Sequence, residues 1–154
     1  MSKAKPIYIL DFALKDVDNN SNKLSFSKFK DKPFFMTFFS VGCGFCKTML
    51  DDLKCVKEEL SGKVDAIAVG LDGSPKEMKN YIKKQKLNFN AVIANQALVD
   101  RLGGIASTPY TYLVDKYGNI FSGTPGTMDC TDIIRLMKEK GFVEGSKKVE
   151  KSKT

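Results

Sequence analysis

The two cysteines of Cys43-Gly44-Phe45-Cys46 are the residues whose types and spacing most clearly permit chemistry. Two intervening residues bring the sulfurs within reach of each other, so the second can resolve a mixed disulfide formed by the first. In Cys-X-X-Cys motifs the thiol pKa commonly falls to roughly 3.5–7.5, which gives a reactive thiolate near neutral pH. The motif therefore predicts thiol–disulfide exchange, with Cys43 as the nucleophile and Cys46 as the resolving cysteine.

Two other interpretations of this pair are open from the motif alone. The cysteines could be small buried apolar residues, or they could be half of a zinc site. Zinc usually takes a second Cys or His pair at matching spacing, and the sequence has no histidine and only two further cysteines, at positions 55 and 130. The lack of histidine also excludes a Cys–His protease and histidine-ligated metals.

The remaining cysteines, Cys55 and Cys130, are expected to play no redox role. Cys55 follows Cys46 by nine residues on one predicted helix, which separates them by about 13 Å along the axis and places them on opposite faces. We expect Cys55 to be a buried packing residue. Cys130 lies near the start of the last predicted helix, where we expect a packing or capping-region role.

The elements on either side of the motif would position its sulfurs. Residues 33–40 contain a phenylalanine-rich apolar run, which predicts a strand buried on both faces. A helical stripe of Met49, Leu53, Val56 and Leu60 follows, and Ser61-Gly62 ends it. The cysteines would thus lie at a helix N-terminus, where free N–H groups and the helix dipole stabilise a thiolate.

The rest of the pattern alternates strands with helices. Strands are expected at 7–14 (with a break near Asp11), 23–26, 64–71, 90–94, 110–114 and 120–122, and helices at 74–86, 97–102 and 127–140. Residues 25–29 could instead form a short helical turn capped by Ser25 or Ser27. This order predicts an α/β fold with a parallel core sheet and an antiparallel hairpin at its edge.

Length and charge bound the organisation of the chain. Its 154 residues suit one domain, which we place at 1–144, with 145–154 as a flexible lysine-rich tail. The net charge of +7 comes largely from both ends and residues 76–86, without the interleaved aromatics of nucleic-acid readers. No apolar run is long enough to span a membrane and no signal peptide is visible. The compartment would be cytoplasmic if Met1 is native, and periplasmic or cell-envelope if a leader was removed.

Five stretches carry a resemblance to a known family: residues 12–16, 38–40, 43–46, 67–72, and 104–109 followed by 112–120. They resemble the thioredoxin-like superfamily, and specifically its TlpA-type thiol–disulfide oxidoreductases, which are related to the AhpC/TSA proteins. The resemblance covers about residues 9–142. It implies a thioredoxin-like three-layer α/β/α sandwich with a mixed central sheet and an N-terminal β-hairpin extension.

The resemblance also implies the remaining parts of the site. Thr108-Pro109 would have a cis peptide bond facing the cysteines, with the Thr108 backbone binding an extended substrate and the Pro109 ring shielding the sulfurs. Gly44 and Phe45 would contact the same substrate. The enzyme would need no metal and no cofactor besides its Cys43–Cys46 disulfide. Its partners would be a protein thiol or disulfide substrate and an upstream redox partner. The chain itself would be a monomer, and antioxidant activity is a further expectation.

Two departures from the family concern the proton acceptor for Cys46. Thioredoxins often have a buried acid six residues before the first cysteine, which is Thr37 here, and some TlpA-type proteins have a glutamate at the position of Met49. Nearby Lys47 could favour a thiolate through its charge. The Gly44-Phe45 pair leaves the reduction potential open between roughly −270 and −120 mV.

The sequence leaves two alternative functions open. A peroxiredoxin-like peroxidase would need a Pro-x-x-x-Thr/Ser-x-x-Cys loop, and Ser40 and Cys43 fit its end while Met36 stands in place of the proline. A copper(I) carrier or redox module could use the two soft thiolates, although histidine ligands are missing.

Overall fold

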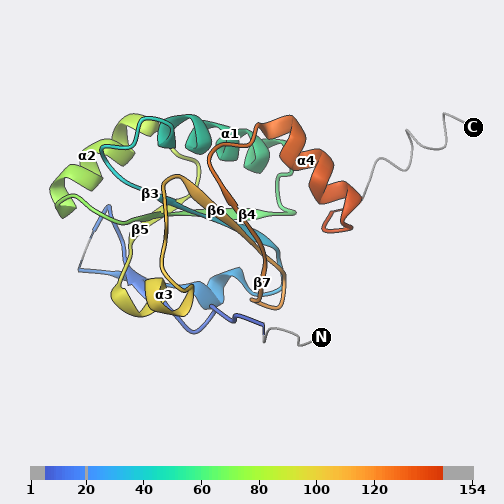
Figure 1. The fold of residues 1–154 in the computed structure, drawn as a ribbon, viewed down its shortest axis with the longest axis horizontal. Helices are drawn as coiled ribbons and strands as arrows, with labels where there is room; N and C mark the ends of the chain where they lie inside the picture. The colour runs from blue at the N-terminus through green and yellow to red at the C-terminus, as the bar shows by residue number, and fades with distance from the viewer. Residues whose placement is uncertain (1–5, 20, 144–154) are drawn as a thin grey trace, which may run out of the picture.

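A computed structural model describes residues 6–19 and 21–143, so the predicted tail at 145–154 lies outside the described residues. The strands are β1 (Ala13–Lys15), β2 (Lys23–Ser25), β3 (Phe34–Phe39), β4 (Asp65–Gly70), β5 (Asn90–Ile93), β6 (Tyr110–Val114) and β7 (Ile120–Pro125). The helices are the 3-10 helix η1 (Phe26–Phe29) and the α-helices α1 (Cys46–Glu59), α2 (Pro75–Gln85), α3 (Gln96–Arg101) and α4 (Cys130–Glu139). They form the predicted three layers: α1, α2 and α4 cover one face of the central sheet, and α3 lies on the other (Figure 1).

The central sheet has the strand order β5-β4-β3-β6-β7. β3 pairs in parallel with β4, and β4 in parallel with β5, whereas β6 runs antiparallel to both β3 and β7. The predicted parallel core with an antiparallel hairpin at its edge is therefore confirmed. The carboxyl ends of β3 and β4 meet at one end of the sheet, the left side in Figure 1.

Strand β3 forms the centre of the molecule, and all six of its residues are buried. Its side chains alternate between the two faces, as a pleated strand requires. Phe34, Met36 and Phe38 pack with the layer that contains Leu98 of α3, while Phe39 packs with Cys46 and Leu50 of α1. The prediction of a strand buried on both faces is confirmed.

The start of α2 agrees closely with its sequence. Ser74 accepts a hydrogen bond from the Glu77 N–H (3.1 Å), Glu77 Oε1 accepts one from the Ser74 N–H (2.8 Å), and Pro75 is the first helical residue. This capping box begins the helix directly after β4. Gly73, just before the cap, has a φ of +98°. Its α-carbon lies near Val41, so the cap sits against the loop that precedes α1.

The N-terminal region differs from the predicted strand at 7–14. A turn at Leu10 and Asp11 divides it, so only Ala13–Lys15 pairs with β2, while Tyr8 forms an isolated bridge with Asn119. The predicted break near Asp11 is confirmed, but residues before it form no strand beyond the Tyr8 bridge, because Ile9 and Leu10 turn into the core. Ser25 caps the short helical turn η1, as the alternative interpretation expected.

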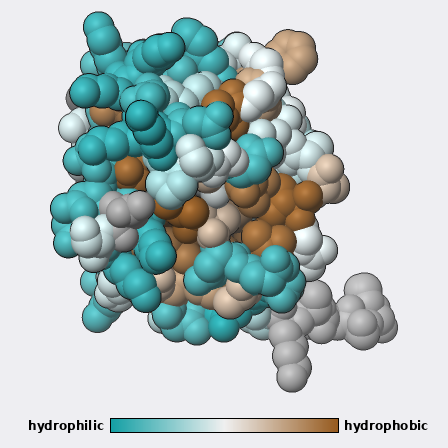
Figure 2. Space-filling view, turned by 90° about the vertical axis from the view of Figure 1, so that its left-hand side faces the viewer, coloured by the Kyte–Doolittle hydropathy of each residue, from teal (hydrophilic) through white to brown (hydrophobic). Residues whose placement is uncertain are grey.

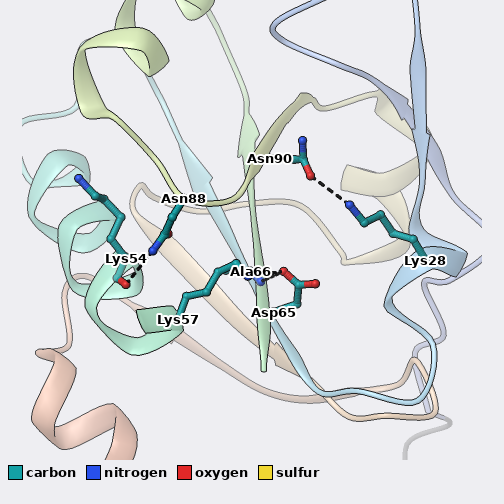
Figure 3. Close-up of polar contacts among 7 residues, drawn as sticks. All are labelled: Lys28, Lys54, Lys57, Asp65, Ala66, Asn88 and Asn90. Carbon is teal, nitrogen blue, oxygen red and sulfur yellow. Dashed lines mark hydrogen bonds and ion pairs between the residues drawn. The ribbon is translucent and has the colours of Figure 1, made fainter. Parts of the chain in front are cut away.

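Polar contacts hold the C-terminal half of α1 against its neighbours (Figure 3). The Lys54 carbonyl accepts a hydrogen bond from Asn88 Nδ2 (3.2 Å), and Lys57 Nζ lies 3.5 Å from Asp65 Oδ1 at the start of β4. Lys54 Nζ also donates to the Gln85 carbonyl at the end of α2 (2.9 Å). These contacts fix the helix that begins at Cys46. None of the helices described in 6–19 and 21–143 is long and apolar enough to cross a bilayer.

Candidate active site

Cys43 and Cys46 are joined by a disulfide, with their α-carbons 5.5 Å apart. Cys43 lies in the loop after β3, and Cys46 is the first residue of α1, so the helix starts three residues later than the first cysteine. The side chain of Cys46 is fully buried, whereas Cys43 is half-buried. Only the Cys43 side of the disulfide is therefore open to an incoming thiolate.

The N-terminus of α1 has neither a side-chain cap nor an acidic residue in its first turn. Phe45 occupies the cap position. The unpaired N–H groups and the positive end of the helix dipole are thus available to the loop that holds Cys43. Such a position stabilises a thiolate relative to a thiol.

Lys47 contributes less than the sequence suggested. Its ammonium forms an i,i+4 ion pair with Asp51 at 2.9 Å, and both side chains are largely exposed. The carboxylate of Asp51 offsets the charge of Lys47, and water screens the rest. The expected thiolate stabilisation at this site therefore comes from the helix terminus rather than from this lysine.

The Thr108–Pro109 peptide bond is cis, as the family resemblance implied. Phe38 of β3 pairs with Tyr110 of β6, so Pro109 lies at the end of the sheet where β3 leads into the Cys43 loop. Pro109 is buried and Thr108 half-buried. The Pro109 carbonyl accepts a hydrogen bond from the Gly126 N–H (2.9 Å), which connects this turn to the start of the β7–α4 loop.

The surface around this end of the sheet is apolar at its centre. Figure 2 looks onto this end and shows hydrophobic residues gathered in its middle and right, with hydrophilic residues around them. Phe45 is 71% exposed, and a side chain added at Gly44 would meet only open space. Half-buried Val41, Ile93 and Ile105 belong to the loops and strand ends on this side.

No carboxylate stands at either of the two positions where the family often has one. Thr37 is buried, and its Oγ1 lies 2.8 Å from Oγ1 of buried Thr111, so the two hydroxyls share a hydrogen bond. Met49 is also buried, and its sulfur accepts a hydrogen bond from the Met128 N–H (3.4 Å). Neither side chain can take a proton from Cys46 as a carboxylate would.

Tyr81 is half-buried with a buried hydroxyl, and the sequence presented it only as part of an apolar helix face. Its ring stacks on Phe39 with centroids 5.5 Å apart, and its hydroxyl has no hydrogen-bond partner in the described part of the chain. Burial, and secondarily the charge of Asp51, raises the pKa of Tyr81 above its ordinary value. The hydroxyl therefore stays protonated at neutral pH.

The prediction that Cys55 and Cys130 are packing residues is wrong, because they form a second disulfide with their α-carbons 6.0 Å apart. Cys130 begins α4, near the predicted place, but α4 packs beside α1 and brings it to Cys55. Periodicity shows which face of a helix is buried but not which helix covers it. An even number of cysteines was the available indication of a second pair.

Asp52 lies beside this second disulfide. Its Oδ1 accepts a hydrogen bond from the Cys130 N–H (3.2 Å). Partial burial raises the pKa of Asp52, the Cys130 hydrogen bond opposes that shift, and the nearby charges of Asp129 and Asp51 add to it. Within residues 6–19 and 21–143, no three His, Cys, Asp or Glu side chains cluster in a way that could hold a metal ion.

Comparison with known proteins gives concordant matches. The profile of the AhpC/TSA family matches residues 8–122. The chain is 24% identical over 123 residues to the thiol-disulfide oxidoreductase ResA of Bacillus thuringiensis, covering 79% of this chain and 71% of the relative. It is 27% identical over 127 residues to the ResA of Geobacillus thermodenitrificans, covering 80% and 70%.

Solved structures share the fold. A thioredoxin-family thiol:disulfide interchange protein from Chlorobium tepidum superposes with a TM-score of 0.77 at 23% identity, covering 90% of this chain and 98% of that one. A DsbF homologue from Corynebacterium diphtheriae superposes with a TM-score of 0.75 at 17% identity, covering 90% of each chain. At these identities the likeness establishes the thioredoxin-like fold.

Proposed function

Because the chain belongs to the AhpC/TSA family, we propose that it is a protein thiol–disulfide oxidoreductase that works through Cys43 and Cys46. The observation that carries this proposal is the unequal exposure of the two sulfurs: Cys43 is half-buried, and Cys46 is fully buried at the start of α1. The names of the ResA relatives support the same activity.

In the first step, the Cys43 thiolate attacks one sulfur of a substrate disulfide. A bond forms between Cys43 and that sulfur, and the other substrate sulfur leaves as a thiolate that takes a proton from water. The helix N-terminus keeps Cys43 in its nucleophilic form. Cys43 is only half-buried, so a substrate disulfide can approach its sulfur in line with the bond that breaks.

In the second step, Cys46 loses its proton and attacks the sulfur of Cys43. The substrate leaves as a second thiol, having gained two electrons and two protons in all, and the enzyme is left with the Cys43–Cys46 disulfide. A dithiol partner then reduces this disulfide. With Thr37 and Met49 unable to accept the proton, water or the departing substrate thiolate takes it.

The substrate is a polypeptide in extended conformation. Thr108 would offer its backbone to hydrogen bonds with that chain, and Pro109 would shield the sulfurs. The exposed ring of Phe45 and the open backbone at Gly44 would contact the residues beside the substrate cysteine. We place this activity in one domain, residues 1–144, acting as a monomer.

We further propose that the protein works in an oxidising compartment such as the periplasm or cell envelope. The Cys55–Cys130 disulfide takes no part in the proposed reaction, and disulfides of that kind persist mainly in such compartments. Expression in the cytosol and in the periplasm of one bacterial host tests this. Recovery of both disulfides from the cytosolic sample would contradict the proposal.

Alkylation followed by mass spectrometry tests the activity itself. Reduced protein mixed with a peptide disulfide should lose two thiols, at Cys43 and Cys46, while the peptide gains two, and a dithiol should reverse the change. Loss of thiols elsewhere, or no transfer, would exclude the mechanism. The reduction potential of the pair then gives the direction: about −270 mV favours a reductant and about −120 mV an oxidant.

The same preparation distinguishes the two alternative activities. Met36, where a peroxidase loop would need proline, is fully buried in the middle of β3 and pairs with β4 and β6, so no loop forms there. Peroxide consumption at a rate above that of peptide disulfide reduction would nevertheless favour a peroxidase. Tight binding of copper(I) against a competing chelator would favour a carrier.

A further inference from the structure

A line of three residues along α1 contacts the segment that leads into α4. Met49, Asp52 and Cys55 are spaced by three, which places them on one side of the helix. Met49 Sδ accepts the Met128 N–H, Asp52 Oδ1 accepts the Cys130 N–H, and Cys55 is bonded to Cys130. We call these three contacts the α1–α4 seam. Cys55–Cys130 is its covalent member.

The segment held by the seam also supports Pro109. The Gly126 N–H donates to the Pro109 carbonyl at 2.9 Å, two residues before Met128. The chain from Gly126 to Cys130 is therefore fixed at one end to the Pro109 turn, which lies at the same end of the sheet as the Cys43 loop, and at the other to α1. Displacement of this segment would displace Pro109 relative to Cys43 and Cys46.

The surroundings of Cys130 disfavour a thiolate. Asp129 caps α4 by accepting the Thr131 N–H (2.7 Å), and Asp132 lies in the first turn, paired with Arg135. With Asp52 on the Cys130 N–H, three carboxylates already offset the positive end of this helix. A carboxylate-rich site also repels an attacking thiolate, and the Cys130 side chain is only 8% exposed.

The two disulfides are also separated. Cys46 and Cys55 lie nine residues apart on α1, which corresponds to about 13 Å along the helix axis. α1 is an unbroken helix between them, with its far half held by Lys54 and Lys57. Sulfurs at this distance cannot exchange directly, so electrons do not pass from one pair to the other within the fold.

We propose that Cys55–Cys130 is a structural disulfide that stays oxidised during turnover and positions the 126–130 segment, and with it Pro109, beside the catalytic pair. It forms once, when the two thiols give two electrons and two protons to a disulfide-bearing oxidant of the compartment. Cys55 and Cys130 are thus positioning residues. The positioning half of the proposal rests on the proposed function, whereas the redox half does not.

Graded reduction of the wild-type protein tests the redox half. Samples are treated with rising concentrations of dithiothreitol, alkylated, digested and analysed by mass spectrometry. We expect Cys43 and Cys46 to be alkylated first and Cys55 and Cys130 to stay protected until the concentration is at least about tenfold higher. Simultaneous or earlier alkylation of Cys55 and Cys130 would overturn the proposal, even if the protein has no exchange activity.

Kinetics of the C55A/C130A variant test the positioning half. We expect the KM for a peptide disulfide to rise about fivefold while kcat changes less than about twofold, because Pro109 is less well held. The matched control is Ile134→Ala, which removes a half-buried side chain of α4 outside the seam. It should destabilise the protein while leaving KM unchanged. An unchanged KM in folded C55A/C130A, or an equal rise in the control, would overturn the positioning role.

A milder variant covers the case in which C55A/C130A does not fold. Met49→Leu keeps an apolar side chain but removes the sulfur that accepts the Met128 N–H. We expect its KM to rise about twofold and the amide of Gly126 to exchange with solvent faster than in wild type. A KM and a Gly126 exchange rate equal to those of the wild type would contradict the positioning role of the α1–α4 seam. If the wild-type protein shows no turnover at all, the proposed function is refuted. The alkylation result then tests the redox half of the proposal by itself.

Discussion

The two disulfides of this chain each include the first residue of a helix, yet their surroundings are opposite. Cys46 begins α1 without an acidic residue in the first turn or a side-chain cap. Cys130 begins α4 with Asp129 as the cap, Asp132 in the first turn and the Asp52 carboxylate on its own N–H. One helix terminus is therefore free to stabilise a thiolate, and the other is already occupied by carboxylates.

Chain separation adds to this contrast, whereas burial does not, because each pair has one half-buried and one buried cysteine. The catalytic cysteines are three residues apart, and the second pair joins residues 75 apart on two helices. A short-range disulfide can open without loss of fold, while a long-range one restricts the unfolded chain. We therefore expect the same covalent bond to serve reaction in one place and stability in the other, with local charge and chain separation deciding which.

The largest effect should come from removing the nucleophilic sulfur of Cys43. Cys43→Ser should lower the rate of peptide disulfide exchange by about a thousandfold or more, because serine cannot form the mixed disulfide. C55A/C130A should keep its turnover within about tenfold of wild type. Stopped-flow measurement with a fluorogenic peptide disulfide compares the two. Equal losses would end the distinction between the pairs.

The next effect concerns stability. C55A/C130A should lower the free energy of unfolding by about 4 kcal/mol, since the bond closes a long loop. Reduction of Cys43–Cys46 alone should cost less, because its loop is short. Urea unfolding of the oxidised, selectively reduced and double-variant proteins measures both. A larger loss on opening Cys43–Cys46 would reverse the roles assigned here.

The sequence predicted the Cys43–Cys46 site much better than it predicted the second disulfide. The phenylalanine run of β3, the Ser74 cap and the Cys43–Cys46 motif are local patterns, and they correctly predicted a buried strand, a helix start and a cysteine pair within bonding distance. The turn at Asp11 was predicted, but the strand expected before it is reduced to the single bridge at Tyr8. Local patterns suffice where the determining contacts lie within a few residues.

The second disulfide was missed because its cause is not local. The approach of α1 to α4 depends on how both helices pack on the sheet, and Asp52 reaches Cys130 only after that packing. The hydroxyl pair of Thr37 and Thr111 is similar, since it joins β3 to β6. Contacts between residues about 75 apart follow from topology and cannot be taken from periodicity.

A smaller effect should follow from making the start of α1 resemble that of α4. Thr48 is exposed in the first turn, and Thr48→Asp would place a carboxylate there. The thiolate fraction of Cys43 should fall, and exchange at pH 7 and low salt should slow about threefold. Thr48→Asn is the neutral control. An unchanged rate, or equal slowing by both variants, would show that the helix terminus does not govern Cys43.

The smallest effect concerns Asp52, whose pKa is raised chiefly by burial. Just above pH 3.8, the Asp52 carboxyl is more protonated in the folded protein than in the unfolded chain. Its contribution to stability therefore falls as the pH rises from the unfolded pKa through the raised folded pKa, and it stays lost at higher pH. Asp52→Asn should remove that fall and gain about 0.3 kcal/mol at pH 7, a small value because much of the carboxylate is hydrated. Urea unfolding at pH 4 and pH 7 against wild type measures it, and a larger loss at pH 7 would contradict the sign.

Trapping of the reaction intermediate tests the central claim most directly. Cys46→Ser leaves the Cys43 thiolate able to attack but removes the sulfur that would release the substrate. Incubated with a peptide disulfide, this variant should accumulate one mixed disulfide, and peptide mapping should locate it at Cys43. An adduct at Cys55 or Cys130, or none at all, would contradict the account.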